Sequence, residues 1–180
     1  MERNLTYIAL FAALIAVLGL VPKIDLASGV PITAQSLGIM LCGTVLGARR
    51  GALAVLLFLA LVAIGLPLLS GGRGGIGVFA TASVGFLLGF PIAAFVTGWV
   101  MERTTLAVGP AAWAASVIGG IGVLYLCGIA GMAVMLDKSL TEASFLAMAF
   151  LPGDVVKTVL AGLVTAAVAG MRPGTLLSRA

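Results

Sequence analysis

Six apolar runs dominate the chain, and each is long enough, or nearly so, to cross a lipid bilayer. The runs are residues 5–21, 33–46, 51–69, 76–101, 111–136 and 154–171. Backbone groups in hydrocarbon must be paired within helices or a closed barrel, and no alternating pattern indicates a barrel. The sequence therefore predicts an all-α integral membrane protein with six transmembrane helices in a single domain, residues 1–180. The first run is expected to be a retained helix rather than a cleaved signal.

The composition indicates that lipid is the solvent for most of the surface. Of the residues, 62% are hydrophobic and 9% charged, whereas roughly a quarter are charged in a soluble domain. The net charge of +4 does not predict nucleic-acid binding, because the basic residues stand singly or in pairs and form no basic face.

The charges between the runs predict the orientation in the membrane. With both termini inside, the inner loops and ends hold Arg3, Arg49, Arg50, Arg103, Arg172 and Arg179 against Glu2 and Glu102. The outer side then holds Lys23, Arg73, Lys138 and Lys157 against Asp25, Asp137, Glu142 and Asp154. Since basic loops stay in the cytoplasm, both termini are predicted to be cytoplasmic.

A glycine-rich segment, SGGRGGIG at 70–77, lies in the outer loop between the third and fourth runs. Its glycines match GxGxxG, but no βαβ unit surrounds them, so the match does not indicate a dinucleotide site. The loop backbone around Gly74 could approach a ligand closely, and Arg73 could pair with a ligand carboxylate. The alternative is a flexible outer turn with a solvated arginine.

Asp154 and Lys157 lie three residues apart where the sixth run begins, and so share one helix face. One interpretation is an N-cap aspartate and a lysine that reaches toward water. The other is a ligand-facing pair, because a carboxylate can accept two parallel N–H donors and an ammonium can donate to a carbonyl. That chemistry suits a cyclic urea or an amide. Thr33, Gln35 and Ser36 could line the same cavity. The alternative is helix capping by Thr33 and a solvated Gln35 amide.

The chain has no histidine, and its two cysteines lie far apart inside apolar runs. We therefore expect no metal site, no cofactor and no histidine-based catalysis, and the protein is not expected to be an enzyme. It also lacks a GxxxxGK[ST] motif, so it is not expected to be its own P-loop ATPase.

Several separated motifs together resemble one family, the biotin-specific S components of energy-coupling-factor (ECF) transporters, the BioY family. In chain order these motifs are PITAQSLG at 31–38, LGARRGAL at 46–53, IGLP at 64–67, the glycine-rich loop at 71–77, residues 85–90 and LPGDVVK at 151–157. The resemblance extends over nearly the whole chain.

The resemblance implies a biotin site near the outer face, roofed by the first outer loop and the glycine-rich loop. Asp154 and Lys157 match the family's acidic and basic pair, which is expected to bind the ureido head. The family usually has a Gly-Pro-Thr-Gly-Gly-Tyr sequence entering the fourth helix, whereas this chain reads TASVGF at 81–86. Ser83 is expected to replace the threonine hydroxyl there. The predicted site thus comprises Asp154, Lys157, Arg73, Gln35, Ser83 and Gly74.

The resemblance also implies partners: a membrane scaffold (T) subunit and two ATPase (A) subunits, in a bacterial cytoplasmic membrane. Small residues four apart on the first helix contact the scaffold in such proteins, and two pairs fit, Ala9 with Ala13 and Ala12 with Ala16. Ordinary helix packing is the alternative for both pairs.

Two other functions stay open at this point. The altered segment 81–86 allows an S component for a different vitamin. A structural membrane protein without a small ligand would leave the outer charges merely solvated.

Overall fold

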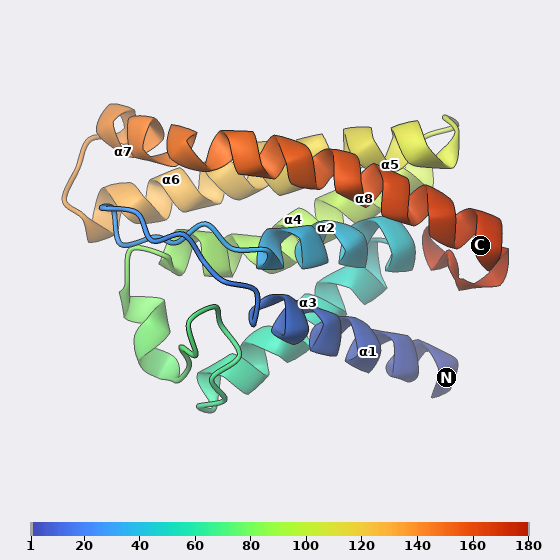
Figure 1. Cartoon of the computed structure of the whole chain (residues 1–180), viewed down its shortest axis with the longest axis horizontal. Helices are drawn as coiled ribbons and strands as arrows, with labels where there is room; N and C mark the ends of the chain where they lie inside the picture. The colour runs from blue at the N-terminus through green and yellow to red at the C-terminus, as the bar shows by residue number, and fades with distance from the viewer. Residues whose placement is uncertain (1, 180) are drawn as a thin grey trace.

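The apolar runs fold as helices (Figure 1). The computed structural model describes residues 2–179. The α-helices are α1 (Glu2–Leu18), α2 (Gln35–Leu46), α3 (Ala48–Ala63), α4 (Val84–Arg103), α5 (Val108–Ser116), α6 (Leu124–Met135), α7 (Leu140–Ala147) and α8 (Leu151–Met171). A π-helical segment, η2 (Val117–Val123), joins α5 to α6, and short 3-10 turns lie at η1 (Ile76–Ala80), η3 (Met148–Phe150), η4 (Pro173–Thr175) and η5 (Leu177–Arg179). The predicted all-α fold is confirmed.

Three helical segments are long and apolar enough to cross a membrane: α4, the continuous 28 residues of α5–η2–α6, and α8. This confirms a multi-pass helical membrane protein, while the number of six spans stays a prediction. The second run forms α2, only 12 residues long and therefore about 18 Å. Eleven of those residues are buried, so α2 lies inside the bundle, which removes the need to match the bilayer thickness.

Some helix ends differ from those predicted. α3 ends at Ala63 rather than at residue 69, because Gly65 takes φ 113° and Pro67 follows. The fourth run divides into η1 and α4. α8 begins at Leu151, with Pro152 in its first turn, a position where the missing N–H costs nothing. Asp154 is thus inside the first turn of α8, and the N-cap interpretation was wrong.

Glycines allow the central helices to approach closely. A Cβ on Gly43 of α2 would lie 2.6 Å from Cβ of Thr97 on α4. Gly85 of α4 packs directly against the backbone of Cys127 and Gly131 on α6. Small residues in α2 and α4 thus let these helices approach their neighbours closely. Gly47, with φ 86°, has a further role because it ends α2.

The bundle has two different ends (Figure 1). Both termini lie at one end. The opposite end carries the long α1–α2 and α3–α4 connections and α7, whose N-terminus is closed by a capping box between Ser139 and Glu142. The segment before the last long helix therefore forms the short helix α7, and these connections surround the candidate site.

Candidate functional site

A pocket opens at the loop end of the bundle, between the first turns of α2, α4 and α8 and the adjoining α6. It is a small cavity of about 70 Å³ that opens to solvent. Its apolar wall consists of Val30, Pro31, Ile32, Leu69, Phe86, Leu87, Phe90, Leu124 and Phe150. Its polar groups come from Thr33, Gln35, Ser36, Arg73, Ser83, Asp154 and Lys157.

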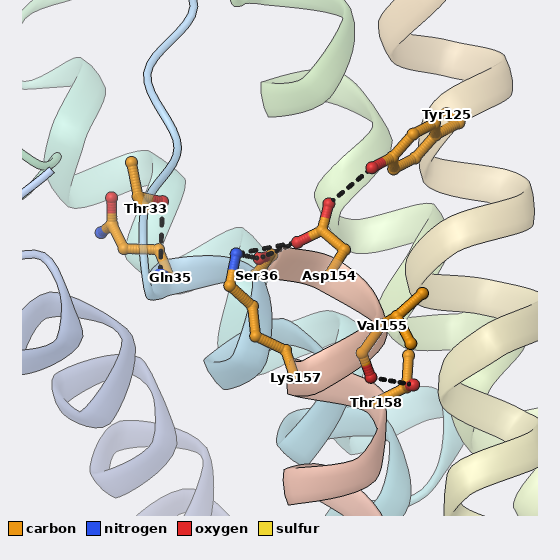
Figure 2. A network of polar contacts seen from close by, with 8 residues as sticks. All are labelled: Thr33, Gln35, Ser36, Tyr125, Asp154, Val155, Lys157 and Thr158. Atoms are coloured by element: carbon orange, nitrogen blue, oxygen red, sulfur yellow. Dashed lines mark hydrogen bonds and ion pairs between the residues drawn. The ribbon is translucent and has the colours of Figure 1, made fainter. Parts of the chain in front are cut away.

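Asp154 is the centre of a four-residue polar cluster (Figure 2). Its Oδ1 accepts hydrogen bonds from Lys157 Nζ at 2.8 Å and from Ser36 Oγ at 3.1 Å, and its Oδ2 accepts from the Tyr125 hydroxyl at 2.8 Å. Lys157 Nζ also donates to Ser36 Oγ at 2.9 Å. The cluster joins α2, α6 and α8, so the predicted acid and base face a pocket rather than lipid.

The ion pair in this cluster is mostly shielded from solvent. The Asp154 and Lys157 side chains are 8% and 13% exposed. A buried carboxylate needs its charge balanced and its lone pairs satisfied, and here one cation and two hydroxyls do so. A carboxylate has about four acceptor sites, so the three bonds leave capacity for a ligand donor.

Arg73 lies in the pocket wall at the end of a tight turn. The backbone groups of Leu69 and Arg73 bond to each other in both directions, at 3.0 and 3.2 Å, and Arg73 Nε donates to Ser70 O at 3.3 Å. Gly71 and Gly72 take φ 80° and 70° within this turn, a conformation that glycine adopts without strain. The glycine-rich loop therefore holds a cation at the pocket, and this cation forms no ion pair with Asp154 within residues 2–179.

Ser83 lies in the pocket wall just before α4. Its side chain is 5% exposed, and its hydroxyl has no hydrogen-bond partner within residues 2–179. Such a buried hydroxyl costs about 1–3 kcal/mol when unpaired, and a water molecule or a polar ligand atom could pair with it.

Two of the predicted site residues, Gln35 and Gly74, contact the protein backbone rather than the Asp154 cluster. Gln35 lines the pocket, but its Nε2 donates to the carbonyls of Ile15 and Leu68, and its Oε1 accepts from the Ser70 N–H. It thereby fastens α1 and the glycine-rich loop to α2. Gly74 is outside the pocket wall and packs directly against the Leu66 carbonyl.

The alanines of α1 divide between two faces. Ala9 and Ala13 are exposed, whereas Ala12 is buried and Ala16 is half-buried in the bundle. Ala9 and Ala13 are therefore the pair that a partner helix could contact.

Tyr125 is the residue that sequence reasoning missed. One signal was available, because a tyrosine inside an apolar run usually pairs its hydroxyl. Its partner, 29 positions away, could not be deduced without knowing where α6 and α8 lie in the bundle. Among the described residues no cluster of three or more cysteine, aspartate or glutamate side chains could hold a metal.

Fold and pocket together define a multi-pass helical membrane protein with a ligand chamber at one end of its bundle. The profile of the BioY family matches residues 2–174. The chain belongs to the BioY family, which confirms the resemblance seen in the sequence motifs.

Individual relatives agree with this membership. The chain is 52% identical to the biotin transporter BioY of Rhodobacter capsulatus, over 99% of this chain and 100% of that protein. It is 41% identical to the probable biotin transporter BioY of Bacillus subtilis, over 86% and 83% of the two chains. The crystal structure of the S-component for biotin from an ECF-type ABC transporter superposes with a TM-score of 0.88 at 29% identity, covering 94% of this chain and 92% of that one.

Proposed function

We propose that this protein binds biotin in the Asp154 pocket as the substrate-binding S component of an ATP-driven ECF importer. The observation that carries the proposal is the pairing of Asp154 with Lys157 and Ser36 beside an apolar chamber. It is a binding protein and not an enzyme, since its relatives are transporters.

The two polar regions of the pocket fit the two ends of biotin. A cyclic urea presents N–H donors and one carbonyl acceptor, which match the Asp154 carboxylate and the Lys157 ammonium. Arg73, in the wall of the same pocket, would hold the carboxylate at the other end of the ligand.

The apolar wall fits the part of biotin between these ends. Phe86 makes edge-on contacts with Phe150 and Tyr125, with ring centres 5.6 and 6.3 Å apart. These rings and Phe90 would cover the sulfur-containing ring, and the Ser83 hydroxyl would meet a polar ligand atom.

We further propose the topology and partners of a complete importer. Six passes would place both termini in the cytoplasm of a bacterial cell and the pocket at the outer face of its cytoplasmic membrane. The exposed face of α1 around Ala9 and Ala13 would contact the T scaffold, and two A subunits would supply ATP hydrolysis.

Thermal unfolding of the purified protein in detergent tests ligand identity. Biotin at a hundred times its Kd should stabilise the native state by about 2.7 kcal/mol, whereas thiamine, riboflavin and pantothenate should not. Stabilisation by another vitamin and not by biotin would show an S component of different specificity. No stabilisation by any of them would contradict a vitamin-binding role.

A further inference from the structure

A second hollow lies at the end of the bundle that carries both termini, far from the Asp154 pocket. Its volume is about 700 Å³, and it opens to solvent. Its walls are the C-terminus of α2, the start of α3, the last turns of α4 and the segment after α8, with the residues Arg49, Arg50, Phe95, Trp99, Glu102 and Arg179 among them. We call it the arginine groove.

The arginine groove has more positive charge than its own residues neutralise. Its acid, Glu102, accepts the Ala48 N–H at 2.8 Å through Oε1. Arg50 Nη1 donates to the carbonyls of Leu46 and Leu177 at 3.4 and 3.3 Å. Neither Arg49 nor Arg50 forms an ion pair within residues 2–179, and Arg49 makes no side-chain hydrogen bond there. Their free N–H donors match the two unesterified oxygens of a phosphodiester.

The groove continues onto a face of α4 that carries aromatic side chains. Phe95 and Trp99 are 42% and 44% exposed and, four residues apart, lie on one helix face. The Arg103 guanidinium carbon lies 5.0 Å from the centre of the Trp99 ring. Apolar rings that lead up to arginines at a helix end are the arrangement expected where a membrane helix meets lipid headgroups.

We propose that the arginine groove binds the phosphodiester headgroup of an anionic phospholipid. Arg49 and Arg50 hold the phosphate, and the acyl chains lie against Phe95 and Trp99. This site would be separate from vitamin capture, because the two hollows share no lining residue.

Fluorescence quenching by brominated lipids in reconstituted vesicles tests the proposal. The chain has two tryptophans, so a Trp113→Phe variant leaves Trp99 as the reporter. Brominated phosphatidylglycerol should be preferred over brominated phosphatidylcholine at Trp99. The double change Arg49→Gln with Arg50→Gln should reduce that preference by about thirtyfold, at ~1 kcal/mol per arginine. Arg49→Gln alone serves if the double variant does not fold.

Matched controls distinguish a specific lipid site from nonspecific electrostatic attraction to anionic lipid. Arg172→Gln, an exposed arginine at the same end but outside the groove, should leave the preference intact. A Trp99→Phe variant leaves Trp113 on α5 as the reporter. Its quenching by the two brominated lipids should differ little. Equal quenching by both lipids at Trp99, or a preference unaffected by the Arg49 and Arg50 changes, would overturn the proposal. Loss of the preference for phosphatidylglycerol on adding inorganic phosphate at constant ionic strength would also overturn the proposal, because a free phosphate would then be the ligand.

Discussion

The Tyr125 hydroxyl donates a 2.8 Å hydrogen bond to Oδ2 of Asp154 and so links α6 to α8 at the pocket. Since Lys157 and Ser36 bond to the other oxygen, Tyr125 fixes the plane of the carboxylate. That orientation determines which direction remains open to ligand donors.

Tyr125→Phe should therefore weaken biotin binding by about tenfold or more, because a hydrogen bond to a charged group contributes roughly 1.5–3 kcal/mol. Equilibrium binding of radiolabelled biotin to the purified protein measures the change. Tyr7→Phe, at the other tyrosine of the chain and on α1, is the control and should leave affinity unaltered. Equal affinity in both variants would show that Tyr125 does not position Asp154.

Arg73→Gln should weaken biotin binding by about ten- to a hundredfold, since a charge-assisted bond to the ligand carboxylate is lost. The same variant should bind biotin amide almost as well as the unaltered protein does, because the amide has no carboxylate to pair. Competition binding with both ligands measures this. Equal losses for the two ligands would rule out carboxylate pairing and indicate a role for Arg73 in loop structure.

Lys157→Met should lower the free energy of unfolding by about 3–5 kcal/mol, because it leaves the Asp154 charge buried without its cation. The double variant with Asp154→Asn should recover part of that loss, since neither charge then remains. Thermal unfolding without ligand measures both. If the two single effects simply add in the double variant, the pair is not energetically coupled.

Two glycine substitutions should change stability in opposite directions. Gly85→Ala should destabilise the protein by about 1–3 kcal/mol, because the added Cβ meets the backbone of α6. Gly170→Ala in α8 meets nothing within 4 Å and should stabilise by up to about 1 kcal/mol through helix propensity. Thermal unfolding of the two variants measures this contrast, and a similar effect of both would contradict close α4–α6 packing.

Local patterns predicted much of the fold and the acid–base pair. Long apolar runs permit little besides helices in lipid, and a separation of three residues puts Asp154 and Lys157 on one face in any helix. The helix ends were less predictable. The last run was expected to begin at residue 154, yet α8 begins at Leu151 and has Pro152 in its first turn.

Contacts between distant segments could not be deduced in the same way. Gln35 was expected to face a ligand, but its amide is bonded to the backbone of α1 and of the 68–70 segment. The Tyr125–Asp154 bond depends on where α6 and α8 lie in the bundle. Such pairings follow from how helices pack, and no periodicity within one run contains that information.

Isothermal titration calorimetry of biotin with the purified protein tests the central claim most directly. The unaltered chain should bind one biotin per molecule with saturable heat, and Asp154→Asn should weaken binding by about ten- to a hundredfold, because one charged acceptor of the ureido group is lost. No heat with the unaltered protein, or the same affinity in the variant, would contradict biotin capture at Asp154.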